Sequence, residues 1–239
     1  MMRVLCVIPA RGGSKRMPDK NIRILCNKPL IAYSIESALE SKLCNKVIVS
    51  TDDPKIASIS KKYGADVVVR PDSLAADTSP LDGALRHAVK FFEKEEAFST
   101  DIVVLLQANV PVRKKGEIDK VLNNLIKTNN ATAVATVYAI DQRPEWMKTI
   151  DAKTGEIKSL MEPKNLYRKQ DLPELYLLDG AIIAIRTQTL METEGVKKVH
   201  GYLGDRIYPF IHDVKYSIEI DEEKDFEIAE YYLRKEQAG

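Results

Sequence analysis

The chain has 239 residues, of which 44% are hydrophobic and 30% are charged. This length and composition suit one globular domain with a sizeable core. Its 36 Lys and Arg residues nearly balance its 35 Asp and Glu residues. The balance argues against a generally basic surface that binds nucleic acid or membranes, so an anionic ligand needs a local cluster of cations.

The cysteine content and the start of the chain indicate a cytoplasmic protein. The three cysteines, Cys6, Cys26 and Cys44, are odd in number and have no C-x-x-C spacing. This pattern argues against a disulfide framework or a zinc site and suits a reducing compartment. The first apolar run is too short for a signal peptide or a membrane span.

Strand-type and helix-type patterns alternate through the first 140 residues. Short apolar runs predict strands at 2–8, 46–50, 65–69, 101–106 and 131–139. Apolar residues at helical spacing predict helices at 29–39, 54–63, 80–95 and 115–127. This alternation predicts an α/β fold, with a mostly parallel sheet covered by helices on both faces.

The alternation breaks between residues 141 and 178, a polar stretch with three prolines. A turn at Lys153-Thr154-Gly155 predicts a hairpin there. The core resumes at 180–185 and is expected to end with a strand at 216–220 and a helix at 222–235. We interpret residues 1–239 as a single domain with an inserted arm at 141–178.

The loop from Pro9 to Lys28 follows the first strand and therefore leaves its carboxyl end, where open α/β sheets bind ligands. Gly12 and Gly13 allow its backbone to approach a phosphate and aim N–H groups at it. Four side chains supply positive charge: Arg11, Lys15, Arg16 and Lys20. Neither the P-loop nor the dinucleotide-binding pattern is present. The position favours a phosphate site, and the alternative is a solvated basic loop.

Near the end of the chain, Glu219 and Asp221 lie two residues apart on the expected strand, so both carboxylates point to one side. Adjacent carboxylates repel unless a cation lies between them, and their oxygens suit Mg²⁺. Alternatively, Asp221 caps the following helix. Asp52 and Asp53 precede another expected helix, for which a cap is favoured. The three histidines show no metal-binding spacing and are expected in structural or surface roles.

The run from Ile8 to Asn21 closely resembles the N-terminal signature of the acylneuraminate (sialic acid) cytidylyltransferases. The similarity continues in the same order through shorter segments, at 50–53, 70–71, 74–79, 105–113, 168–173, 179–182 and 217–225. The first loop is the most specific of these segments, and together they cover the core of the chain.

The resemblance implies a Rossmann-like fold that binds CTP at the first loop. Arg11 and Lys20 would hold the triphosphate, and Asp221 would bind Mg²⁺ with Glu219 beside it. The implied nucleotide pocket is lined by Ala10, Gly12, Asn21, Arg70, Ser79 and Gln107. Arg168 and Lys169 would lie near an acidic sugar, carried by an arm that packs into a homodimer partner.

The reaction implied is attack of a sialic-like nine-carbon ulosonic acid on CTP, giving the CMP-sugar and pyrophosphate. The chain departs from the family pattern at four places: Glu219 and Asp179 replace Asp and Asn, Asn109-Val110 replaces two hydroxyl residues, and Lys169 replaces Arg. Asp179 is expected to place an extra negative charge beside the acidic sugar. The departures leave two alternatives: a transferase for another sugar acid or nucleotide, such as an eight-carbon ulosonic acid, and a nucleotide-binding homologue without catalysis.

Overall fold

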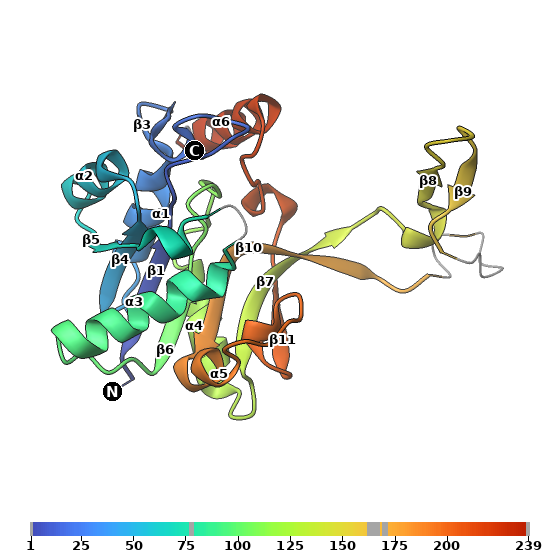
Figure 1. Ribbon diagram of the computed structural model, residues 1–239. Coiled ribbons are helices and arrows are strands. Elements are labelled where there is room, and N and C mark those ends of the chain that lie inside the picture. Colours follow the sequence, from blue (N-terminus) through green and yellow to red (C-terminus); the bar gives the residue numbers. More distant parts are fainter. Residues whose placement is uncertain (1, 77–78, 162–167, 169–171, 238–239) are drawn as a thin grey trace.

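A computed structural model describes residues 2–76, 79–161, 168 and 172–237 (Figure 1). Its centre is a seven-stranded sheet. In spatial order the strands are β11 (Ile207–Ile211), β7 (Ala133–Ile140), β10 (Leu175–Arg186), β6 (Ile102–Leu105), β1 (Val4–Pro9), β4 (Lys46–Thr51) and β5 (Asp66–Val69). Strand β10 is antiparallel to both neighbours, and the other pairings are parallel. The predicted mostly parallel α/β fold is confirmed.

Helices cover both faces of this sheet (Figure 1). One face carries α1 (Leu30–Leu39), α2 (Pro54–Lys62) and α4 (Glu117–Lys127), and the other carries α3 (Leu81–Glu95) and α5 (Thr187–Glu192). Within β1, Cys6 and Ile8 face the first group, and Leu5 and Val7 face the second. Both faces of the strand are buried, which is why its sequence is continuously apolar.

A third apolar cluster joins the first loop to the end of the chain. Helix α6 (Glu223–Gln237) contributes Phe226, Ala229 and Leu233, which pack with Met17 and Leu25. The first loop also contains the 3₁₀ turn η1 (Lys20–Ile22) and a small ribbon of β2 (Ile24–Leu25) and β3 (Lys28–Pro29). The other 3₁₀ turns are η2 (Asp72–Leu74), η3 (Pro144–Trp146), η5 (Gly201–Leu203) and η6 (Val214–Tyr216). No helix in the described part of the chain combines the length and apolar character needed to cross a membrane.

Near the end of the chain one expectation was wrong and one strand was not predicted. Residues 216–220 are not a strand; the Ile220 N–H donates to the Asn109 carbonyl oxygen at 2.8 Å instead of to a sheet partner. Strand β11 was not anticipated, because Pro209 interrupts the apolar pattern and most of its side chains are exposed. Its place at the sheet edge makes a proline tolerable there.

The expected hairpin is present. Strands β8 (Lys148–Ile150) and β9 (Ile157–Ser159) pair antiparallel, and they stand away from the sheet on the extensions of β7 and β10 (Figure 1). Ile150 and Ile157 face each other across the hairpin and are 73% and 71% exposed. The hairpin therefore presents apolar surface that this chain leaves uncovered.

Strand β10 contains an irregularity between Leu178 and Ile183, where its pairing with β7 shifts register. Gly180 lies there with a φ of +68°, and a methyl group on it would come 2.7 Å from Gln107 Cδ. Two backbone N–H groups here donate to side chains instead of to β7. The Ala181 N–H donates to Asp179 Oδ1 at 2.9 Å, and the Ile182 N–H donates to Thr136 Oγ1 at 3.0 Å. The bulge thus brings the backbone directly under Gln107.

We expect Gly180→Ala to destabilise the protein more than Gly155→Ala. Both glycines have positive φ, which costs an L-residue about 1–2 kcal/mol, but nothing lies within 4 Å of a methyl group at Gly155. The Gln107 clash adds about 1–3 kcal/mol at Gly180. Chemical denaturation of the two variants measures the difference, and equal losses would contradict the close packing described.

Candidate active site

Three adjoining cavities lie where the first loop meets the ends of the strands. The first, of about 280 Å³, is lined among others by Ala10, Arg11, Ser14, Lys20, Asn21, Gln107, Asn109, Glu219 and Asp221. Arg70 and Ser79 line the second cavity, and Lys15 and Arg16 the third. Arg11 lines all three. Most of the sequence-predicted site residues are thus brought together in one extended space.

The charges in this space favour an anionic ligand. Its lining has five basic side chains, Arg11, Lys15, Arg16, Lys20 and Arg70, and two acidic ones, Glu219 and Asp221. Arginines can grip phosphate oxygens in pairs, and lysines act as point charges. A surplus of cations next to two carboxylates suits a polyphosphate with a divalent metal ion.

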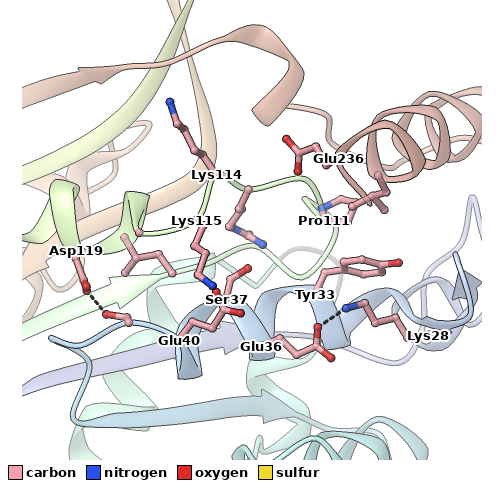
Figure 2. A pocket seen from close by; sticks show the side chains of 15 residues that line it. Lys28, Tyr33, Glu36, Ser37, Glu40, Pro111, Lys114, Lys115, Asp119 and Glu236 are labelled. Atoms are coloured by element: carbon pink, nitrogen blue, oxygen red, sulfur yellow. Dashed lines mark hydrogen bonds and ion pairs between the residues drawn. The ribbon is translucent and has the colours of Figure 1, made fainter. Parts of the chain in front are cut away.

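Figure 2 shows a different cavity of about 280 Å³, between α1, the segment before α4 and α6. Its four basic residues, Lys28, Arg113, Lys114 and Lys115, face four acidic ones, Glu36, Glu40, Asp119 and Glu236. Lys28 is paired with Glu36, and Ser41 with Asp119 (Figure 2). This cavity has no surplus charge for a triphosphate.

Gly12 has a different role from the one expected. Its N–H donates to Asp52 Oδ1 at 3.1 Å, and a methyl group on it would come 2.7 Å from Asp53 Oδ2. It is not among the residues that line the three cavities. Gly12 therefore lets the loop approach the end of β4, and its N–H is not aimed at the cavity. Asp53 caps α2 as favoured, accepting from Lys55 and Ile56 N–H groups at 2.7 and 3.1 Å.

The side chains of Asn21 and Lys20 form hydrogen bonds that fix the cation-rich first loop. The Asn21 side chain is buried and donates to the Arg11 carbonyl oxygen at 3.0 Å. Lys20 Nζ donates to Asp221 Oδ1 at 2.8 Å and to the Ile220 carbonyl oxygen at 2.9 Å. The first loop and the carboxylate segment are thereby joined across the cavity.

The structure argues against the capping role of Asp221. The carboxylate that accepts from the N–H groups at the start of α6 belongs to Asp225, which bonds Asp221 N at 3.1 Å and Glu222 N at 2.9 Å. Asp221 instead lines the cavity and pairs with Lys20. Its side chain is 45% exposed, so a ligand can reach it.

Glu219 has a partner that sequence reasoning missed. The Asn109 side-chain amide donates to Glu219 Oε1 at 3.1 Å and to the Ile220 carbonyl oxygen at 3.3 Å. Partial burial of the carboxyl group and the nearby Asp221 raise the pKa of Glu219, against the effect of Asn109. The longer Glu219 side chain is thus held by a residue that itself departs from the family pattern.

Arg70 and Ser79 lie at the far end of the extended space. Arg70 is buried and its guanidinium donates to the Ser50 carbonyl oxygen at 2.7 Å, while Ser79 Oγ donates to the Ser73 carbonyl oxygen at 3.1 Å. Burial, together with the Arg11 charge, lowers the pKa of Arg70. Added negative charge in this part of the cavity is therefore favourable.

Of the two predicted arm residues, only Arg168 is among the described residues. Arg168 is exposed and does not line the three cavities of its own chain. Lys169 lies outside the described residues. Among the described residues, Arg168 is therefore not joined to the three cavities.

Asp179 does not face the ligand, contrary to expectation. Its side chain is 2% exposed, and its Oδ2 lies 2.5 Å from both His212 Nε2 and Ser217 Oγ. Burial alone would raise the pKa of the Asp179 carboxyl, but hydrogen bonds from His212, Ser217 and Thr136 lower it below its usual value. The extra negative charge is therefore paired with a histidine inside the protein.

A mostly parallel α/β sheet with a cation-rich loop after its first strand, facing carboxylates at the end of the chain, is the arrangement of a nucleotidyltransferase. Residues 5–238 match the family described as Cytidylyltransferase, and the chain belongs to this family. It is a cytidylyltransferase of the CMP-sialic acid synthetase type.

Curated relatives match most of the chain. CMP-N,N'-diacetyllegionaminic acid synthase of Legionella pneumophila is 32% identical over 96% of this chain and 95% of its own length. Pseudaminic acid cytidylyltransferase of Campylobacter jejuni is 32% identical over 83% of this chain and 85% of its own length. The solved structure of CMP:2-keto-3-deoxy-manno-octonic acid synthetase with CTP has a TM-score of 0.72 at 19% identity, covering 98% of this chain and 99% of its own. This last similarity supports the fold.

We expect thermal stability to fall as the pH rises from about 7 to about 9.5. Burial alone lowers the pKa of His212, but hydrogen bonds to Asp179 and Glu117 outweigh it and raise the pKa from 6.5 to about 9. The stabilisation is complete below the unfolded pKa of 6.5 and is lost as the pH rises through about 9. Thermal unfolding followed by circular dichroism measures the decline. The same decline in His212→Asn would contradict this assignment.

Proposed function

We propose that the protein transfers the cytidylyl group of CTP to a sialic-like nine-carbon ulosonic acid and releases pyrophosphate. The observation that carries the proposal is the extended space with five basic residues facing Glu219 and Asp221. The names of three relatives support the substrate class. Two name legionaminic acid and pseudaminic acid, and the relative from Escherichia coli is an N-acylneuraminate cytidylyltransferase. Three free thiols support the proposed cytoplasmic location.

In the proposed reaction the anomeric hydroxyl of the sugar attacks the α-phosphorus of CTP in line with the leaving group. The new bond joins the anomeric oxygen to the α-phosphorus, the bond from the α-phosphorus to pyrophosphate breaks with its electron pair leaving on pyrophosphate, and the hydroxyl proton passes to water. Arg11 and Lys20 line the cavity where the phosphates would lie and would stabilise negative charge as pyrophosphate departs. Asn21 donates to the Arg11 carbonyl oxygen and so restrains the backbone from which the guanidinium would reach the phosphates.

We propose Mg²⁺ as the cofactor. Within the described residues no cluster of three or more His, Cys, Asp or Glu side chains is arranged for a metal ion, but Glu219 and Asp221 line one cavity with Lys20. Two carboxylates completed by phosphate oxygens and water suit Mg²⁺. When bound, the ion would neutralise phosphate charge. A phosphate that binds Lys20 in place of Asp221 would leave the Asp221 carboxylate available to the metal ion.

Pyrophosphate release tests the proposal directly. The assay contains CTP, Mg²⁺ and each of sialic, legionaminic and pseudaminic acid. The other nucleoside triphosphates and an eight-carbon ulosonic acid serve as comparisons. Turnover with CTP and one nine-carbon acid supports the proposal and names the substrate. Turnover only with the eight-carbon acid or another nucleotide replaces the proposal with that transferase. CTP binding without turnover across the panel indicates a silent homologue.

We expect Arg11→Ala to lower kcat/KM by at least about a hundredfold, since a charged donor at the departing phosphate would be lost. The matched control is Arg234→Ala, which removes an exposed arginine that pairs with Glu230 on α6. Steady-state kinetics give the loss, and circular dichroism checks that both variants fold. Normal turnover of a folded Arg11→Ala variant would refute the phosphate site.

We further propose that the arm at 141–178 packs into the partner of a homodimer and completes its sugar site with Arg168 and Lys169. Two observations support this: the exposed Ile150–Ile157 pair on the hairpin, and the exposure of Arg168 away from the cavities of its own chain. Apolar side chains exposed this fully on a protruding element are typical of a protein–protein interface.

We expect the double change Ile150→Asp and Ile157→Asp to convert the dimer to a monomer, because charged groups would be buried in the interface. The measurement is sedimentation velocity, together with the KM for the sugar acid, which rises in the monomer. Thr149→Asp, on the alternate side of the same strand, is the control and keeps the dimer. A wild-type monomer, or an unchanged dimer after the double change, would refute this arrangement.

A further inference from the structure

His212 follows β11 and is enclosed by acidic and polar groups from three parts of the fold. Its Nδ1 lies 3.2 Å from Glu117 Oε2, and its Nε2 lies 2.5 Å from Asp179 Oδ2 and 2.9 Å from Ser217 Oγ. The side chains of His212, Asp179 and Glu117 are 3%, 2% and 5% exposed. Ionised carboxylates only accept hydrogen bonds, so both ring nitrogens donate and the ring is an imidazolium.

This cluster joins pieces of the chain that carry site residues. Asp179 accepts a hydrogen bond from the Ala181 N–H in the bulge of β10, where Gly180 lies directly under Gln107. Ser217 is bonded to Asp179 and His212 and begins the segment that leads to Glu219 and Asp221. The sheet, the carboxylate segment and the start of α4 at Glu117 therefore meet at one imidazole ring.

A buried arginine holds the same bulge from its other side. Arg113 donates to the Ala181 carbonyl oxygen at 3.1 Å, to the Gln107 carbonyl oxygen at 2.7 Å and to Ser34 Oγ at 2.8 Å. Gln107 and Gly180 are thus fixed between Arg113 and the His212 cluster. His212 itself does not line the cavities that would hold CTP.

We propose that His212 is a positioning residue for the transfer reaction: held between Asp179 and Glu117, it fixes the β10 bulge beneath Gln107 and the segment that presents Glu219 and Asp221 to the nucleotide. The inference rests on the proposed function. His212 touches neither substrate and acts through Asp179 and Ser217.

The physical reason is the cost of unpaired buried charge. Without the imidazolium, the carboxylates of Asp179 and Glu117 have no cation between them, and a buried charge that loses its partner is strongly destabilising. The carboxylates relieve this by separating or by taking up a proton. Either response loosens the bonds that tie Ser217 to the bulge, so the metal-binding segment moves relative to Gln107.

The experiment compares His212→Asn with the double variant Asp179→Asn and His212→Asn, and with His200→Asn as the matched control. His200 is exposed and has a φ of +56°, a conformation that asparagine tolerates. The measurements are kcat and KM with CTP and the best sugar acid, and CTP affinity with Mg²⁺ by calorimetry, which needs no turnover. Circular dichroism checks folding.

We expect His212→Asn to lose about ten- to a hundredfold in kcat/KM and to bind Mg²⁺–CTP more weakly, as is usual for a residue that orients metal-binding groups. The double variant recovers most of this loss, because Asp179→Asn removes the unpaired charge and the side-chain amide that it introduces can still accept from the Ala181 N–H. His200→Asn behaves as the wild type. Unchanged kinetics in a folded His212→Asn, or no recovery in the double variant, would overturn the proposal.

A pH profile keeps the proposal testable if His212→Asn does not fold. The groups around the ring are Asp179, Glu117 and Ser217, with the Tyr216 ring 6.1 Å away and Arg113 near both carboxylates. Wild-type kcat/KM should decline as the ring loses its proton at alkaline pH, and the double variant should lack this step. Equal declines in both would overturn the proposal. A wild-type protein that turns over none of the substrates refutes the proposed function instead. The role of His212 is then still tested by calorimetry, because CTP affinity is measured without turnover.

Discussion

The contact between Lys20 and Asp221 joins two parts of the chain 201 residues apart, and the candidate site depends on it. The first loop carries most of the cations and the last connection carries both carboxylates, so the pair sets their distance across the cavity. Partly exposed ion pairs contribute about 1 kcal/mol or less, and the Asp221 side chain is 45% exposed. A contact this weak can hold the two segments in place and still be exchanged for phosphate.

The sequence was most informative where burial follows a regular pattern, either continuous along a strand or confined to one face of a helix. Strand β1 is buried on both faces and α3 on one, so their patterns reveal them. The first loop was located because it follows β1. The same reasoning failed at 216–220. There Ile218 and Ile220 alternate with polar residues as in a strand, but the Ile220 N–H donates to the Asn109 carbonyl oxygen in a loop. Alternation shows which side chains are buried, whereas a strand also needs a neighbour to pair with.

The contacts around Asp179 could not be predicted from the sequence. The family resemblance led us to expect its charge beside an acidic sugar, because Asp179 stands where the family pattern has Asn. The bulge in β10 turns the side chain inward, where His212 and Ser217 meet it from 33 and 38 residues away. Nothing local to either residue signals this pairing. The register shift between β7 and β10 occurs next to Asp179, and it is a property of the assembled sheet.

Two of the departures from the family pattern are accompanied by a nearby partner. Asn109 donates to Glu219, and His212 neutralises Asp179. Random loss of function would leave such groups without partners, at a cost of about 1–3 kcal/mol for an unsatisfied buried polar group and more for a charge. Here the altered groups are bonded, and Arg11, Lys20 and Asp221 still line one cavity. This compensation favours a working transferase with an adjusted site over a homologue whose site has decayed.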